Sequence, residues 1–158
     1  MSKNKKPRFS NDVTVENRRA RFDYEILEKY EAGIELAGSE VKSLREGGGS
    51  LTDTYAQEIG GQVFLRGLHI KPYIQATSVQ LDPDRERRLL MHRKEINRLM
   101  GQVSTQGLTL VPLQLYFNER GLAKIQLALC RGKKAHDKRE TIKERDLQRE
   151  MRRDMKVR

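Results

Sequence analysis

The sequence has little of what supports an extracellular or metal-stabilised fold. Its 158 residues include one cysteine and no tryptophan, and aromatic residues make up 6%. The single cysteine, Cys130, excludes an internal disulfide framework and is typical of a protein from a reducing compartment. The three histidines, His69, His92 and His136, are too scattered to form a ligand pair at zinc-finger spacing. We therefore expect no metal site and no cofactor.

Long apolar runs are also missing. No stretch reaches the roughly 18 apolar residues of a membrane span. The basic N-terminus is followed by no apolar stretch, which argues against a cleaved secretory signal. These observations predict a cytoplasmic protein that makes no membrane contact.

Charge is abundant, and it is unevenly distributed. The chain has 32 Lys and Arg residues against 22 Asp and Glu residues, a net charge of +10. Residues 1–21 hold seven basic and two acidic residues, and residues 131–158 hold twelve and six, which leaves 13 basic and 14 acidic residues in 22–130. A near-neutral body with two cationic arms is typical of a polyanion binder, because phosphate neutralisation releases counterions. The alternative is a soluble protein with solvated charge runs.

The apolar pattern divides the chain into three parts. Residues 1–12 are polar and predict a flexible basic arm. Residues 13–130 carry the apolar periodicity of one modest core and form the predicted binding domain. Residues 131–158 form a basic tail without Phe, Tyr or Trp.

The tail has one thin apolar stripe. Leu147, Met151 and Met155 are spaced i, i+4, i+8, and such a stripe is too narrow to hold an isolated helix against solvent. We expect the tail to be disordered when free and helical when bound to a surface.

Period-two spacing predicts strands in the body. The even positions from Phe22 to Tyr30 hold aromatic or β-branched residues at four of five places, which indicates a half-buried strand that Gly33 separates from Ile34. The Gly60-Gly61 pair predicts a tight turn, because glycine tolerates positive φ angles.

Other strands follow from the same pattern. That turn joins a strand at Tyr55–Ile59 to one at Gln62–Ile70, and Tyr73–Leu81 extends the sheet. A final pair is predicted at Leu108–Phe117 and Leu122–Cys130. Pro112 in this pair indicates a sheet edge or a bulge, because proline cannot donate to the ladder.

Two short helices are expected between the strands. Ser39 is placed to cap the first, in which Val41 and Leu44 share a face, and Gly47 is placed to end it. The second is predicted to begin at the segment Asp82-Pro83-Asp84.

The second helix is predicted to end at Gly101. Its apolar stripe is predicted to consist of Leu89, Ile96, Leu99 and Met100. Leu90 lies off this stripe and is expected to be exposed. With five to seven short strands, a basic helix before the final pair and no βαβ alternation, we expect a mainly β fold. The predicted architecture is a small antiparallel barrel of the oligonucleotide-binding kind, with two or three short helices.

Catalytic interpretations are poorly supported. Gly47–Ser50 is not followed by the Lys-Ser or Lys-Thr of a P-loop. His136 and Asp137, close to Lys133 and Lys134, could be drawn as a nuclease site, but they lie in the least foldable segment. We expect no enzymatic activity.

Nucleic-acid binding accounts for the same residues. Arginine and lysine supply phosphate contacts, and the imidazole of His136 can stack on an unpaired RNA base. A solvated histidine in a basic tail is the alternative. Tyr24, Tyr30 and Tyr55 sit at strand spacing and are expected in the core or at its rim.

Several sequence blocks occur together in an order and spacing that resemble one family. They are Asn17–Arg21, Tyr30–Gly33, Gly38–Arg45, Leu89-Leu90, Gly132–Arg139 and Ile142–Arg145. The chain resembles small protein B, the SsrA-binding protein family of bacterial trans-translation, over nearly its whole length.

The resemblance implies an oligonucleotide-binding-type barrel with a tail. Such a protein binds the tRNA-like domain of transfer-messenger RNA and delivers it, with elongation factor Tu, to stalled ribosomes for rescue and peptide tagging. It imitates the anticodon half of a tRNA, acts as a monomer, and places its tail in the decoding centre and the empty mRNA channel of the small subunit.

The resemblance also implies functional residues. The expected RNA-binding positions are Asn17, Arg19, Arg21, Glu31, Lys42, Arg45, Leu90 and His92. The expected contacts with the ribosomal decoding centre are Gly132, Lys133, Lys134, His136, Asp137, Lys138 and Arg139. Two positions depart from relatives, which often have asparagine at the His92 position and in some cases tryptophan at that of Leu147.

Glu31 needs its own explanation, because a carboxylate repels phosphates. It fits an RNA interface as an acceptor of hydrogen bonds from base amino or hydroxyl groups. A more general alternative remains open, a ribosomal or tRNA-binding barrel protein with basic extensions.

Overall fold

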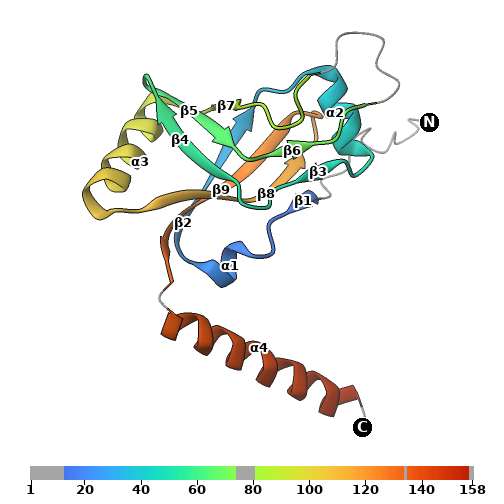
Figure 1. Ribbon diagram of the computed structural model, residues 1–158, viewed down its shortest axis with the longest axis vertical. Helices are drawn as coiled ribbons and strands as arrows, with labels where there is room; N and C mark the ends of the chain where they lie inside the picture. The colour runs from blue at the N-terminus through green and yellow to red at the C-terminus, as the bar shows by residue number, and fades with distance from the viewer. Residues whose placement is uncertain (1–12, 74–80, 134, 157–158) are drawn as a thin grey trace, which may run out of the picture.

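Six antiparallel strands close into a barrel. The computed structural model describes residues 13–73, 81–133 and 135–156. The main sheet has the order β1-β8-β4-β5-β7-β2-β9, and a further pairing of β8 with β9 closes the ring (Figure 1). The strands of the ring are β2 (Tyr24–Ile34), β4 (Tyr55–Ile59), β5 (Gln62–Arg66), β7 (Arg87–Leu90), β8 (Thr109–Phe117) and β9 (Ala123–Gly132). The predicted mainly β antiparallel barrel is confirmed.

Strand β8 bridges the two ends of the open sheet. It pairs with β9 from end to end, while its other edge is shared by β4, at Leu110, and by β1 (Val13–Glu16). Its register shifts between Pro112 and Gln114, so of the edge or bulge predicted at Pro112 the bulge is the one present. A separate two-stranded sheet joins β3 (Gly49–Ser50) to β6 (His69–Ile70).

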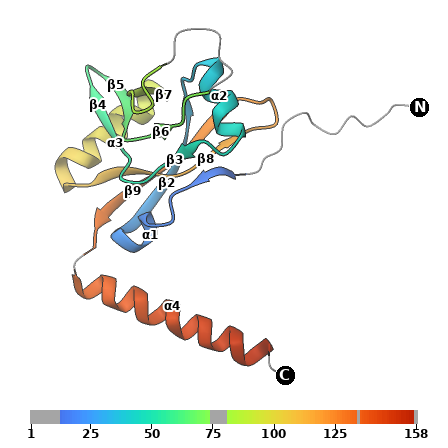
Figure 2. The ribbon, with the colours of Figure 1, turned by 45° about the vertical axis from the view of Figure 1, so that its right-hand side comes forward.

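The helices lie around the barrel. They are α1 (Ala20–Asp23), α2 (Gly38–Arg45), α3 (Arg93–Gln106) and α4 (Ala135–Lys156). Helices α2 and α3 lie toward opposite ends of the barrel, and α4 projects away from it after β9 (Figures 1 and 2). The α1 turn lies between the barrel and the first turns of α4.

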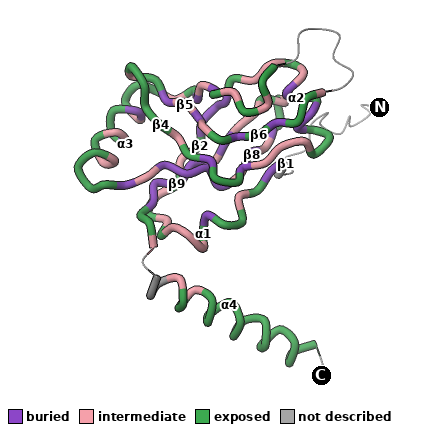
Figure 3. The backbone as a smooth tube through the Cα atoms, in the orientation of Figure 1, coloured by how far each residue is buried: buried purple, intermediate pink, exposed green. Residues whose placement is uncertain are grey.

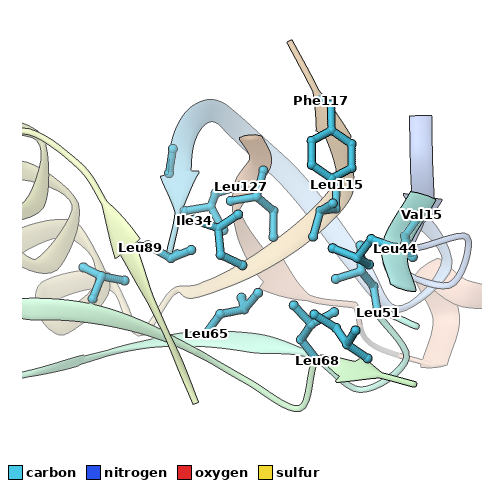
Figure 4. Close-up of a cluster of buried hydrophobic side chains, with 14 of the residues drawn as sticks. Val15, Ile34, Leu44, Leu51, Leu65, Leu68, Leu89, Leu115, Phe117 and Leu127 are labelled. Carbon is cyan, nitrogen blue, oxygen red and sulfur yellow. The ribbon is translucent and has the colours of Figure 1, made fainter. Parts of the chain in front are cut away.

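Leucine is the commonest residue type in the core. Leu65, Leu68, Leu115 and Leu127 are among its fully buried members, and they come from different strands and loops (Figure 4). Each buried side chain of this size stabilises the fold by about 1.5–3 kcal/mol. No residue of α4 belongs to the described core clusters, and this helix is exposed over most of its length (Figure 3).

The predicted helix from Asp82 to Gly101 is wrong in its first half. Arg87–Leu90 form strand β7, and α3 begins at Arg93, continues through Gly101 and ends before Gly107, whose φ is +62°. Leu89 is therefore not part of a helical stripe. It pairs with Ile34 of β2 and Val63 of β5, and this pairing on both sides overrides local helix propensity.

Two smaller predictions are also corrected. Ser39 does not cap α2, which begins at Gly38; Glu40 instead accepts a hydrogen bond from the Ala37 N–H, at 3.0 Å. Gly33 does not end the strand, because β2 continues to Ile34.

The predicted strand Gln62–Ile70 is wrong beyond Arg66, where β5 ends; His69–Ile70 form β6 of the separate two-stranded sheet. The remaining predictions have these outcomes. The hairpin at Gly60-Gly61, the end of α2 before Gly47 and the final strand pair are confirmed. The predicted sheet extension at 73–81 falls mainly on residues 74–80, outside the described residues. In α4 the stripe residues Leu147, Met151 and Met155 are exposed, and disorder of the free tail stays a prediction.

A buried ion pair joins α2 to β7. The Arg87 side chain is fully buried, and Glu40 is 5% exposed. Nε and Nη2 of Arg87 donate to Oε2 of Glu40 at 2.8 and 2.6 Å. The guanidinium also donates to the carbonyl oxygens of Leu68, Pro83 and Arg85, so the buried charge is both paired and hydrogen-bonded.

The same network sets the acidity of Glu40. Burial alone would raise the pKa of Glu40, but hydrogen bonds from Arg85, from the Ala37 N–H and from Arg87 together lower it below its ordinary value of 4.5. Because the pKa is lower in the folded state, the carboxylate stabilises the fold above about pH 4.5 and loses that contribution as the pH falls through the folded pKa.

Substituting Glu40→Ala should destabilise the protein by about 3–5 kcal/mol, because it leaves the Arg87 charge buried without its partner. Urea unfolding at neutral pH measures this loss. The matched control is Glu35→Ala, which breaks the exposed pair between Arg88 and Glu35 (3.0 Å) and should cost no more than about 1 kcal/mol. Equal losses in the two variants would contradict a special role for the buried pair.

Candidate nucleic-acid interface

A groove runs along the outside of the barrel where β2, β7 and the start of α3 meet. We call it the β7 groove; its volume is about 620 Å³. It brings together Glu31, Leu90 and His92, three of the residues predicted to bind RNA. Its other lining residues are Gly33, Gly61, Gln62, Arg88, Leu89, Met91, Arg93, Glu95, Ile96 and Lys124.

Strand pairing determines how Leu90 is presented. Successive residues of a strand face opposite sides, so Leu89 enters the core while Leu90, 49% exposed, lies on the outer face. Leu90 pairs with Gly33, and a Cβ added to Gly33 would lie 3.2 Å from that of Leu90. The glycine thus permits close approach and leaves an apolar surface on which a base or ribose can pack.

His92 stands at the start of α3. Its backbone is extended, its carbonyl accepts the Ile96 N–H at 3.0 Å, and its side chain is exposed. The helix predicted from Asp82 to Gly101 would contain this histidine; the structure instead places it at the helix boundary, in the β7 groove. The adjacent Arg93 ties the helix to the β4–β5 turn by donating to the Gly61 carbonyl at 2.9 Å.

Sequence reasoning missed the cations of this groove. Arg88, Arg93 and Lys124 come from β7, α3 and β9 and line it together. Alternation along the strands could have placed Arg88 and Lys124 on the outer face, but no local signal predicted that they meet. With Glu31 and Glu95 also in the lining, these cations leave the groove a small positive excess.

Glu31 is held by a tyrosine from another strand. The Tyr116 hydroxyl donates to Oε2 of Glu31. Burial first, and then this hydrogen bond and the carboxylate charge, raise the pKa of Tyr116 to about 12. The phenol therefore stays protonated and remains a donor throughout the physiological range.

A second group of predicted residues lies near α1, lining a separate groove of about 480 Å³. Asn17 has a structural role there. Its side-chain Nδ2 donates to the Pro112 carbonyl oxygen at 3.0 Å, and its backbone N–H donates to the Leu113 carbonyl oxygen at 2.7 Å. Arg19 is exposed, 3.8 Å from Asp23. Both residues line this groove rather than the β7 groove.

The remaining predicted RNA contacts line neither groove. Lys42 and Arg45 are on α2, where Lys42 lies over the Tyr73 ring at 5.7 Å and Arg45 over the Phe117 ring at 4.3 Å. Arg21 is an exposed residue of α1. The eight predicted RNA-binding residues therefore form three surface regions, with the closest grouping in the β7 groove.

The predicted tail contacts begin where β9 ends. Gly132 is the last residue of β9, and Lys133 anchors the tail: its Nζ donates to the Arg21 carbonyl at 2.9 Å and to Thr141 Oγ1 at 2.7 Å. Lys138 lies 3.5 Å from Asp23.

Other tail residues carry fewer described contacts. Arg139 is exposed on α4. Lys134 lies outside the described residues, as do the side chains of His136 and Asp137, whose backbone is part of α4. Within the described ranges, no cluster of three or more His, Cys, Asp or Glu side chains is placed to hold a metal ion. Among these residues, no helix is both long and apolar enough to cross a membrane.

Comparison with known proteins assigns the family. The SmpB protein family model matches residues 14–157. An SsrA-binding protein of Moorella thermoacetica is 56% identical over 146 residues, covering 92% of this chain and 94% of that protein. This chain belongs to the SmpB family. The resemblance found in the sequence motifs is confirmed.

Other members agree over most of their length. An SsrA-binding protein of Chlorobaculum tepidum is 55% identical over 139 residues, 88% of each chain. A solved structure described as "tmRNA-SmpB: a journey to the center of the bacterial ribosome" is 57% identical, with a TM-score of 0.64, and the match covers 76% of this chain and 84% of that one. The SmpB barrel is thus shared in both sequence and fold.

The acidity of Tyr116 provides a direct test of the geometry at Glu31. Near-ultraviolet absorbance after a pH jump should show one of the five tyrosines ionising near pH 12. Tyr116→Phe should remove that component. Glu31→Gln should lower the pKa of Tyr116 but leave the increase that burial causes. Loss of a component titrating near pH 10 in Tyr116→Phe would contradict the hydrogen bond.

Proposed function

We propose that this SmpB protein binds the tRNA-like domain of transfer-messenger RNA and delivers it to stalled ribosomes for trans-translation. The observation that carries the proposal is the meeting of Glu31, Leu90 and His92 in the β7 groove. The family resemblance implies RNA binding at these positions, and the groove offers an acceptor, an apolar surface and an imidazole, with cations around them. Such a surface reads a folded RNA by shape and by base or 2′-hydroxyl contacts.

In this proposal the barrel and the tail have different tasks. The other predicted RNA contacts, Asn17, Arg19, Arg21, Lys42 and Arg45, extend the interface to the barrel surface around α1 and α2. The tail, from Gly132 onward, enters the decoding centre and the empty mRNA channel.

The tail has suitable chemistry for an rRNA-lined channel. Residues 131–158 carry a net charge of +6, and α4 makes no contribution to the described core clusters. Lys133, Lys134, Lys138 and Arg139 would contact phosphates. His136 would stack on an unpaired base beside Asp137.

The proposed role has further consequences. The protein acts as a monomer that imitates the anticodon half of a tRNA, and elongation factor Tu accompanies the RNA. It works in the cytoplasm, where the ribosomes are, and it positions RNA without catalysing a reaction. The barrel, residues 13–130, and the tail act as separate functional units, with residues 1–12 as a basic arm.

Glu31→Ala should weaken binding to the isolated tRNA-like domain by about 1–3 kcal/mol, because it removes an acceptor from a desolvated hydrogen bond. Simple electrostatics predicts the opposite sign, since one fewer carboxylate reduces repulsion of phosphate. Titration of labelled RNA measures the change.

The matched control is Glu28→Ala. Glu28 lies on the same strand and accepts a hydrogen bond from Tyr30, but it is not a lining residue of the β7 groove. Its variant should bind RNA at least as tightly as the parent. Equal or tighter binding by a folded Glu31→Ala variant would overturn the role of Glu31.

Ending the chain after Gly132 should separate the two tasks. This truncation keeps all of β9 and every described core cluster. Binding to the free RNA domain should stay within about tenfold, which is 1.4 kcal/mol, while peptide tagging on stalled ribosomes should fall to background. Loss of more than about two decades in RNA affinity would place the tail in the primary RNA site.

A further inference from the structure

Tyr116 reaches Glu31 across an intervening strand. Glu31 is on β2 and Tyr116 on β8, and β9 lies between them in the barrel. Lys124 of β9 pairs with Tyr116 on one side and with Gly33 on the other, so Tyr116 and Glu31 are diagonal neighbours two residues apart in register. The tyrosine and glutamate side chains together span the intervening strand, and the hydroxyl meets the carboxylate in a hydrogen bond.

The contact is specific to this carboxylate. Among the described residues, Tyr116 is the one whose side chain hydrogen-bonds to the Glu31 carboxylate, although the cation of Lys124 lines the same groove. Tyr116 itself is not a lining residue of the β7 groove. The phenol therefore acts on the groove through Glu31.

A phenol differs from a cation as a partner for an RNA-binding carboxylate. Lysine or arginine would neutralise the carboxylate charge and compete with the hydrogen-bond donors of the RNA. A neutral hydroxyl donates a single hydrogen bond to one carboxylate oxygen and leaves the negative charge in place. It also limits the rotamers of a glutamate side chain, whose freedom would otherwise be lost when RNA binds.

We propose that Tyr116 is a positioning residue of the RNA interface, which holds the Glu31 carboxylate by one oxygen and leaves the other to accept from RNA. The proposal rests on the proposed RNA-binding role of Glu31. Preorganisation of this kind increases affinity without adding a contact between Tyr116 and the RNA.

The test is a double-mutant cycle on RNA affinity. Tyr116→Phe keeps the ring and its packing and removes the hydroxyl. In the parent it should weaken binding to the tRNA-like domain about tenfold, equal to 1.4 kcal/mol. In the Glu31→Ala background the same change should have no effect, because there is no carboxylate left to position.

The chain offers a matched control. The Tyr30 hydroxyl donates to Oε2 of Glu28 on the same strand, and neither residue lines the β7 groove. Tyr30→Phe should leave RNA affinity unchanged, and urea unfolding should show that Tyr116→Phe and Tyr30→Phe are similarly stable.

The outcomes separate the two claims. If Glu31→Ala weakens RNA binding but Tyr116→Phe does not, the positioning role is wrong and the proposed role of Glu31 stands. An equal loss from Tyr116→Phe with and without Glu31 would show direct or structural action by the tyrosine and would also overturn the proposal. If Glu31→Ala binds RNA normally, the role of Glu31 fails and the positioning role fails with it.

Discussion

The pairing of β7 with β5 on one side and β2 on the other is the constraint on which the barrel and its groove depend. It joins segments far apart in the chain, since Ile34 and Val63 both pair with Leu89. The burial pattern alternates along β7, with Arg87 and Leu89 buried and Arg88 and Leu90 more exposed. The two buried residues stabilise the closed ring, and the two outer residues, Arg88 and Leu90, line the β7 groove. One short strand thereby couples folding to the binding surface.

The buried guanidinium of Arg87 links this strand pairing to Glu40 of helix α2. A buried ion pair contributes little net stability, because desolvation offsets most of the attraction. Removing either partner would be costly, because the other charge would stay buried without its partner. The ion pair also attaches α2, which carries Lys42 and Arg45, to the strand that carries Leu90. In the proposed function these two parts of the RNA surface therefore keep a fixed relation.

Much of the fold could be predicted from the sequence, because its signals are local. Period-two spacing, the Gly60-Gly61 turn and Pro112 identified the hairpin, the final strand pair and the bulge. The charge distribution separated the near-neutral body from its cationic arms, and the motifs around Tyr30 and Gly132 indicated the family. The role of Glu31 was likewise inferred from the motif around Tyr30, and that of Leu90 from the Leu89-Leu90 motif.

By itself, then, the sequence determined the barrel class, the basic tail and the family, since each is written in neighbouring residues. Tertiary structure alone decided that Arg87–Leu90 form a strand, because a short run with two leucines fits a helix or a strand until partners on both sides select one. The same holds for the pair of Glu40 with Arg87 and for the contact of Tyr116 with Glu31. The partners are 47 residues apart in the first contact and 85 in the second. Such contacts exist only after the chain has closed its barrel and brought the segments that carry them together.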